Sequence, residues 1–339
     1  MAGEVTVRAV VCPEHGTPDV LRIEKRPVPV PGVGHARIRV RAAAVNFPDV
    51  LLIGGTYQIA VPPPFVPGSE FAGEIVELGP GCEGRTVGDR VTGTGLYGAF
   101  AGQILAPAAN LTPIPDGVDD HTAAAFGVAY RTAYHSLRSV ARVGPGETVI
   151  VLGAGGGVGL AAVQLAVALG AEVVAVASSA AKLATAHSYG ATHLIDHRDG
   201  TLREQLRSAV PGGAAAVLDP VGGDLSEPAL RTLRRGGRFV TIGYASGVIP
   251  RIPLNLVLVK GIQILGFQFQ DIDPDDFTRN EAELRDLLTT GAVRPHIGAV
   301  YPLSEATAAL REVASGTAVG KVVIELRTPW ADRSTPATP

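Results

Sequence analysis

The chain has 339 residues, of which 46% are hydrophobic and 18% charged, and its 29 basic and 32 acidic side chains give a formal net charge of −3. This composition excludes a disordered chain, and the length corresponds to about two domains. The small negative charge supplies no overall positive field for nucleic acid or an anionic membrane, so we expect a small-molecule partner and neither of those two.

The N-terminus and the cysteines bear on the compartment. Residues 1–16 (MAGEVTVRAVVCPEHG) have charged side chains and no apolar core, so we expect no signal peptide. Cys12 and Cys82 are far apart, which fits neither a disulfide framework nor a cysteine zinc cluster. Residues 149–177 are apolar enough to span a bilayer, but their glycines favour a buried strand, turn and helix. We therefore expect a cytoplasmic protein.

Short runs of alternating apolar and polar residues, separated by Pro and Gly, fill the first part of the chain. Examples are ARIRVRAAAV (36–45) and EIVELG (74–79). This alternation is typical of strands with one buried face, and it predicts a β-rich domain over residues 1–125.

Apolar runs alternate with helical stretches over residues 126–268. The predicted strands are ETVIVL (147–152), EVVAVA, THLID, AAAVLD, RFVTIG and IQILGF, and the segments between the first five of them read as helices. This order predicts an α/β domain: a doubly wound parallel sheet of the Rossmann type with helices on both faces. Residues 269–328 add two predicted helices, at 281–290 and 304–314, and a last strand, KVVIEL (321–326), and residues 329–339 are expected to be disordered.

A glycine-rich turn follows the strand ETVIVL. Residues 153–159 read GAGGGVG, with Gly153, Gly156 and Gly159 at the spacing of a dinucleotide-binding turn. Glycines allow a tight bend and close approach to a pyrophosphate, which the free N–H groups at the following helix N-terminus bind. A merely structural turn is the alternative, but the flanking strand and helix favour nucleotide binding.

The end of the second predicted strand indicates which nucleotide is bound. An acidic residue there would bind the ribose hydroxyls of NAD, but Glu172 starts this strand and therefore points away from the cofactor edge. The strand ends at Ser178 and Ser179, and Lys182 follows; hydroxyls and a cation suit a 2′-phosphate. We expect NADPH. The alternative is that Ser178 caps the next helix and Lys182 is solvated.

Two surface features follow in the same domain. A basic run lies at the C-terminus of the predicted helix 225–237: Arg231, Arg234, Arg235 and, just beyond it, Arg238. Cations there oppose the helix dipole and remain solvated, and we favour this interpretation over RNA binding. The apolar segment RIPLNLVLVKGIQILGF (251–267) would leave an exposed hydrophobic edge in a monomer, which predicts a homodimer formed through the Rossmann sheets.

Seven segments, in order, resemble the zinc-free quinone oxidoreductases, the zeta-crystallin-like family of the medium-chain dehydrogenase/reductase superfamily. They are NFPDVLLIGGTYQ (46–58), PFVPGSEFAGEIVELG (64–79), GDRV (88–91), AAFGVAYRTAYHSL (124–137), GAGGGVGLAAVQLA (153–166), DPVGGD (219–224) and GKVVI (320–324). The resemblance covers nearly the whole chain. It implies a GroES-like catalytic domain at 1–125, a Rossmann NADP-binding domain at 126–268, and a return of 269–328 to the catalytic domain, with the site between the domains.

The resemblance also implies a difference from the zinc alcohol dehydrogenases. Asn46 and Ser69 stand where those enzymes hold the metal with cysteine and histidine, and Glu70 alone cannot complete a tetrahedral site. We therefore expect no zinc. Without a Lewis acid the acceptor must already be electrophilic, as quinones and α,β-unsaturated carbonyls are.

Position within these motifs implies roles for single residues. Asn46 would lie near the nicotinamide, and Tyr57 matches a tyrosine that donates a proton in enoyl-thioester reductases; these two are the predicted catalytic residues. His197 stands where relatives often have a tyrosine at the 2′-phosphate, and Thr317 where they have arginine. The predicted cofactor-binding residues are Asn46, Thr132, Gly153, Gly156, Gly157, Val158, Gly159, Ser178, Ser179, Lys182, His197, Gly243 and Phe267.

Three functions remain open. We expect an NADPH-dependent, metal-free reductase of quinones. A 2-enoyl-thioester or enone reductase would share its fold and cofactor, and an NADPH-binding protein with a structural or interaction role is the alternative from another class. Asn46 and Asp49 could also simply cap a short helix, and Tyr57 could be a packed loop residue.

Overall fold

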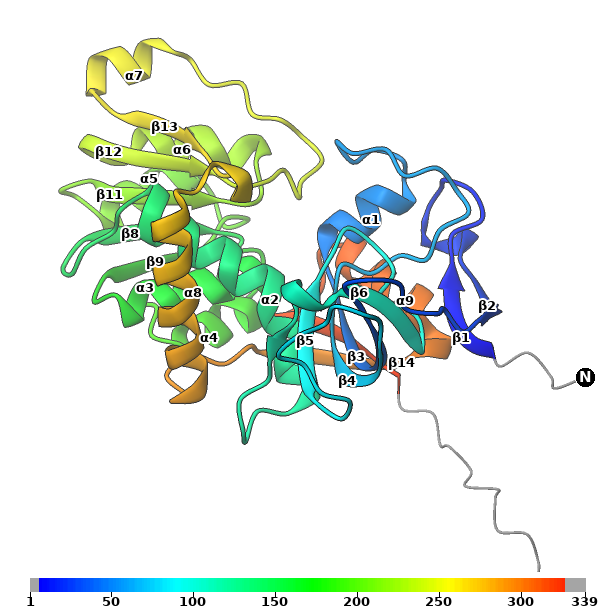
Figure 1. Ribbon diagram of the computed structural model, residues 1–339. Coiled ribbons are helices and arrows are strands. Elements are labelled where there is room, and N and C mark those ends of the chain that lie inside the picture. Colours follow the sequence, from blue (N-terminus) through cyan, green and yellow to red (C-terminus); the bar gives the residue numbers. More distant parts are fainter. Residues whose placement is uncertain (1–5, 327–339) are drawn as a thin grey trace, which may run out of the picture.

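The computed structural model describes residues 6–326, which form two large sheets on either side of helix α2 (Asp120–His135) (Figure 1). The predicted disordered segment 329–339 lies outside the described residues. Helix α2 contacts strands of the first sheet and helix α3 (Gly157–Ala168) of the second domain. The domain boundary predicted between residues 125 and 126 therefore falls inside one helix.

The first sheet has, within the described range, seven strands in the order β14-β15-β3-β4-β5-β7, with β6 also paired to β3. In β3, Ile38 and Val40 are fully buried while Arg37 and Arg39 lie on the other face, which is the alternation seen in the sequence. The strands are β3 (His35–Val45), β4 (Glu70–Leu78), β5 (Arg90–Thr94), β6 (Gln103–Pro107), β7 (Thr112–Pro113), β14 (Ile297–Pro302) and β15 (Lys321–Glu325).

Smaller elements surround this sheet. An antiparallel hairpin precedes it, and two helices and three 3-10 turns pack beside it. Their bounds are β1 (Thr6–Val11), β2 (Arg22–Pro27), α1 (Phe47–Ile53), α9 (Ala306–Ala314), η1 (Pro18–Val20), η2 (Ala108–Asn110) and η6 (Leu303–Glu305).

The second sheet is parallel, in the order β10-β9-β8-β11-β12-β13, which confirms the predicted α/β architecture. In β8, Val149 and Val151 face one helical layer while Ile150 and Leu152 face the other, so the strand is apolar on both faces after Thr148. The strands are β8 (Thr148–Leu152), β9 (Glu172–Ala177), β10 (His193–Asp196), β11 (Ala214–Asp219), β12 (Leu233–Thr241) and β13 (Gln263–Gly266).

Helices cover both faces of the second sheet. Helices α2, α3, α4 and α8 lie on one face, and α5, α6 and α7 on the other. The remaining bounds are α4 (Ala180–Ser188), α5 (Leu202–Ala209), α6 (Ser226–Arg231), α7 (Asn255–Lys260), α8 (Pro274–Thr289), η3 (Ser136–Val140), η4 (Gly223–Leu225) and η5 (Phe269–Asp271). None of the helices within residues 6–326 is long and apolar enough to cross a membrane.

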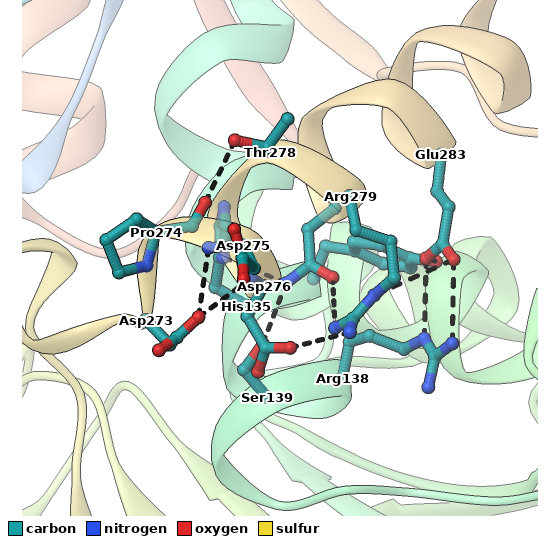
Figure 2. A network of polar contacts seen from close by, with 12 residues as sticks. His135, Arg138, Ser139, Asp273, Pro274, Asp275, Asp276, Thr278, Arg279 and Glu283 are labelled. Atoms are coloured by element: carbon teal, nitrogen blue, oxygen red, sulfur yellow. Dashed lines mark hydrogen bonds and ion pairs between the residues drawn. The ribbon is translucent and has the colours of Figure 1, made fainter.

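Helix α8 is held against the end of α2 by polar contacts (Figure 2). The Asp273 carboxylate accepts the N–H of Asp275 at 2.9 Å and so caps α8, which begins earlier than the helix predicted at 281–290. Arg138, just beyond α2, lies 3.3 Å from Glu283. The Arg138–Glu283 ion pair connects α8, which follows the second sheet, to η3 at the end of α2.

The helix predicted at 225–237 is shorter in the structure. Helix α6 ends at Arg231, and β12 begins at Leu233, which is buried in the core. The prediction that all four arginines lie at a helix C-terminus was therefore wrong for Arg234, Arg235 and Arg238. Pairing of β12 with β11 and β13 outweighs the local helical pattern.

Candidate active site

The glycine turn lies at the carboxyl end of β8, as the sequence predicts. Gly153 has φ +63°, and a Cβ on Gly159 would lie 2.0 Å from the Gly153 carbonyl oxygen, so both positions require glycine. Gly156 is the N-cap of α3, and Gly157 and Val158 form its first turn. Free N–H groups at this helix end are suited to a pyrophosphate.

The first sheet meets the glycine turn at the start of β15. The N–H of Gly320 donates to the Gly155 carbonyl at 2.8 Å, and Gly156 and Gly320 pair as an isolated parallel bridge. Lys321 is the next residue, and its side chain runs along Gly157, where a Cβ would lie 2.7 Å from the lysine Cδ. The two domains are therefore joined at the proposed pyrophosphate site.

A buried polar group surrounds the Lys321 ammonium. The lysine is 4% exposed, and its Nζ lies 2.6 Å from Asn46 Oδ1, 2.8 Å from Glu70 Oε1 and 3.3 Å from the Val45 carbonyl. The Asn46 amide donates to Glu70 Oε1 at 2.9 Å and to Ser69 Oγ at 3.1 Å. We call Asn46, Ser69, Glu70 and Lys321 the lysine cluster.

The lysine cluster also contacts α2. The N–H of Val128 donates to Glu70 Oε2 at 2.8 Å, which fixes the second carboxylate oxygen. Thr132 lies on α2 one turn further along and is buried. The structure thus places Asn46 and Glu70 beside α2, the helix that holds Thr132, and links Asn46 through Lys321 to the glycine turn.

Asp49 occupies the helix-capping position next to the cluster. Its carboxylate accepts the Asn46 N–H at 2.7 Å at the start of α1, so Asp49 has the capping role that the sequence left open. Burial raises the pKa of Asp49 to about 7, against the backbone hydrogen bond from Asn46 and the charge of Lys321. Its Oδ1 has no hydrogen-bond partner within residues 6–326.

The residues predicted to bind the 2′-phosphate lie together beyond β9 and β10. Ser179 caps α4 by accepting the Lys182 N–H at 3.3 Å, so the capping role belongs to Ser179 and not Ser178. The Lys182 ammonium lies 3.4 Å from Ser178 Oγ and also donates to the Gly316 carbonyl. His197 follows β10 and donates its N–H to the Ala177 carbonyl at 3.1 Å.

The electrostatics of this group suit an anion. Burial lowers the pKa of Lys182, and the nearby Arg198 guanidinium lowers it further. Burial also lowers the pKa of His197, and Arg198 and Lys182 add to this effect while Asp196 opposes it. Arg198, the residue after His197, was not among the predicted residues. The structure places its guanidinium near Lys182 and His197, where it also forms an ion pair with Asp196 at 2.8 Å.

Other predicted residues are more scattered. Gly243 follows β12, with its N–H 3.3 Å from the Asp219 carbonyl, and Phe267 follows β13 and packs edge-on to Phe269 at 4.8 Å. Tyr57, in the loop after α1, is half-buried against the first core, and its hydroxyl has no hydrogen-bond partner within the described residues. Thr317 bonds to Ser315 and to the Glu312 carbonyl.

Sequence reasoning did not assign a role to Lys321. The signal available was a lysine directly after a glycine and directly before the apolar run Val322–Ile324. Its partners are distant in the chain, so only the fold shows the cluster. Within residues 6–326, no group of three or more His, Cys, Asp or Glu side chains is arranged to hold a metal ion.

Comparison with known proteins identifies related domains and structures. Residues 32–116 match the alcohol dehydrogenase GroES-like domain, and residues 157–286 match the family described as zinc-binding dehydrogenase. The mouse quinone oxidoreductase-like protein 2 is 35% identical over 325 residues, covering 94% of this chain and 92% of that protein.

Solved structures of quinone oxidoreductases are similar to this chain over nearly its whole length. A quinone oxidoreductase from Thermus thermophilus, solved alone and with NADPH, has a TM-score of 0.82 and 33% identity, covering 94% of this chain and 99% of its own. The Escherichia coli quinone oxidoreductase complexed with NADPH has a TM-score of 0.86 and 27% identity, with the same coverage of 94% and 99%. The predicted combination of a GroES-like domain with a Rossmann-type domain is confirmed.

Proposed function

The chain belongs to the quinone oxidoreductase family of the medium-chain dehydrogenase/reductase superfamily, and from that premise we propose that it is a metal-free, NADPH-dependent reductase of quinones. One observation carries the proposal. The Lys321 side chain runs along the glycine turn at Gly157 and ends on Asn46, so a dinucleotide on that turn would lie beside the lysine cluster.

The residues present fit NADPH. The N–H groups of the turn at 153–159 would bind the pyrophosphate, and Ser178, Ser179, Lys182 and His197 would surround the 2′-phosphate. Glu172 lies at the opposite, amino end of β9 and would not repel that phosphate. Asn46, Thr132, Gly243 and Phe267 would lie about the nicotinamide. When bound, NADPH supplies the hydride.

The residues do not fit a catalytic zinc ion, although one matching family is described as zinc-binding. Asn46 and Ser69 offer an amide and a hydroxyl, neither of which is a usual zinc ligand. The Lys321 ammonium lies 2.8 Å from Glu70, the one carboxylate of the cluster, and a divalent cation placed there would be repelled. We therefore infer that this chain reduces its substrate without zinc.

Without a metal, the protein must stabilise the negative charge that forms on the acceptor with hydrogen bonds and a proton. Both amide hydrogens of Asn46 are occupied by Ser69 and Glu70, so Asn46 positions its neighbours and does not donate a proton. Lys321 has three acceptors for three hydrogens and is equally occupied. Tyr57 has a free hydroxyl and is the proposed proton donor.

We also propose a cytoplasmic homodimer. Helix α7 and the edge strand β13 expose apolar side chains, among them Leu258 on α7 at 83% and Ile264 on β13 at 38%. An unpaired strand edge beside such a surface favours pairing with a second copy of the chain.

The function is tested by following NADPH oxidation with 1,4-benzoquinone, 9,10-phenanthrenequinone and crotonyl-CoA, with and without a zinc chelator. We expect turnover with at least one quinone, unchanged by the chelator. Turnover with crotonyl-CoA alone would identify an enoyl-thioester reductase instead. Tight NADPH binding with no turnover on any of the three would favour a structural or interaction role.

A further inference from the structure

A cavity of about 670 Å³ lies at the edge of the second sheet opposite the glycine turn. Its walls are α5, from Arg203 in the first turn to Arg207 in the last, the C-terminal end of α6, helix α7, and the segments that enter β11 and β12. The strands run from this edge toward the cofactor edge, so the cavity is separate from the candidate active site. Its charged lining residues within the described range are all basic: Arg203, Arg207, Arg231, Arg234, Arg235 and Lys260.

Most of this positive charge has no carboxylate partner. Arg231 pairs with Glu227 at 2.6 Å, and Arg234 pairs with Glu147, also at 2.6 Å. The other four cations form no ion pair within residues 6–326; the Lys260 ammonium instead donates to the carbonyl of Arg231. The excess charge therefore belongs to Arg203, Arg207, Arg235 and Lys260.

Helix dipoles offset only part of this excess positive charge. Each helix C-terminus carries about −0.5 charge, so the three helix ends together offset about 1.5 of the four unpaired charges. Burial and the neighbouring Arg231 and Arg203 guanidiniums lower the pKa of Lys260, the direction expected where cations crowd together. About two to three positive charges remain uncompensated by this count.

We propose that this cavity binds a compact polyphosphate, the di- or triphosphate group of a small anion. Such a group carries the two to four negative charges that would balance the excess, and guanidinium groups bind phosphate oxygens in pairs. The backbone of Gly212 and Gly213 forms part of the wall, so the anion can approach closely. The cations line one concave cavity bounded by helix ends, which favours a compact anion over the extended backbone of a nucleic acid.

The test is calorimetric titration of the full chain with inorganic tripolyphosphate, with ATP as a second arm that distinguishes a free polyphosphate from a nucleotide. Saturating NADPH is present, so that the serine and lysine group beyond β9 is occupied. We expect saturable binding that weakens as salt is raised. The R203A/R235A variant should lose at least about tenfold in affinity. The matched R22A/R285A variant removes two exposed arginines elsewhere and should bind like the wild type.

Two results would overturn the proposal. One is equal affinity in the wild type and the R203A/R235A variant. The other is absence of binding to both polyphosphates while a single-stranded RNA 20-mer binds. If the double variant does not fold, the single Arg203→Ala variant, at an exposed helical position, gives the same comparison. If the wild type does not bind NADPH, the Lys182→Ala variant is titrated with the polyphosphates instead, because it lacks the ammonium beyond β9 that could also bind them. Failure of the proposed function is thereby distinguished from failure of the proposed polyphosphate site.

Discussion

The Lys321 ammonium lies 2.6 Å from Oδ1 of Asn46, although the two residues are 275 positions apart in the chain. Through this contact the last strand of the first sheet holds in place the residue that begins α1. The same ammonium compensates the buried Glu70 carboxylate, which is fully shielded from solvent.

Replacing Lys321 with methionine should therefore destabilise the protein strongly. The change leaves the Glu70 carboxylate buried without its ion pair, which costs about 3–5 kcal/mol of unfolding free energy. Urea denaturation without cofactor measures the loss, and Lys25→Met, at an exposed position of β2, is the control. The K321M/E70Q double variant should recover part of the stability. A Lys321→Met protein as stable as wild type would contradict this view of the cluster.

Asp49 should make stability depend on pH. Burial raises its pKa to about 7, so between pH of about 4 and 7 the folded state retains a proton that the unfolded state has released. The stabilisation is complete below the unfolded pKa and is lost as pH rises through the folded pKa, by at most about 4 kcal/mol.

The Asp49→Asn variant isolates this effect. The difference in unfolding free energy, wild type minus variant, should fall between pH of about 4.5 and 8, as measured by urea denaturation at each pH. Asp224→Asn, at an exposed position, should give a constant difference. A constant difference for Asp49→Asn as well would show that this carboxyl titrates normally.

Lys182 should determine the preference for NADPH over NADH. A charge-assisted contact with a 2′-phosphate contributes about 1.5–3 kcal/mol, so Lys182→Ala should weaken NADPH binding about tenfold to a hundredfold. NADH affinity is the internal control and should hardly change. The dissociation constants of both nucleotides, measured by fluorescence titration, test this, and an equal loss for both would assign Lys182 a structural role through its contact with Gly316.

Tyr57→Phe should report on the substrate class. An enoyl thioester must be protonated at a weakly basic carbon, so the variant should lower kcat about a hundredfold or more. A reduced quinone oxygen takes protons readily from water, so quinone turnover should change little. Steady-state kinetics on both substrates, with NADPH affinity as the control, decide the matter. Full turnover on every enoyl thioester that the wild type accepts would exclude a proton-donor role.

Leu258→Glu should convert a homodimer to a monomer. Leu258 is 83% exposed on α7 beside the edge strand β13, where a second copy would bury it. Light scattering at micromolar concentration measures the mass. Val33→Glu is the control, because Val33 is 77% exposed on the first domain. Monomer mass for the wild type would disprove the dimer.

Local patterns predicted the second domain well. The glycine turn and the apolar strand runs each depend on neighbours within a few residues, so the sequence displays them directly, although the cap of α4 is Ser179 and not Ser178. The error at Arg234 and Arg235 has the opposite origin. Their strand is determined by pairing with β11 and β13, which lie elsewhere in the chain, whereas the local residues favour a helix.

The candidate site was predictable only in pieces. Asn46 and Glu70 could be placed by the resemblance, but neither residue indicates that a lysine from the last strand contacts both of them. Asp49 could be expected to cap a helix; its altered pKa could not, because it follows from complete burial. Long-range contacts of this kind require the assembled fold.

The position of β15 also sets an order in which the protein can be built. This strand pairs with β3, in the register of Ile324 with Ala43 and Val322 with Val45, and β3 leaves the ribosome long before β15 is made. The second domain, encoded between them, has all of its own strands by then. The N-terminal sheet is therefore expected to be completed last, and the lysine cluster with it. In a nascent chain the second domain would fold before the candidate active site is assembled.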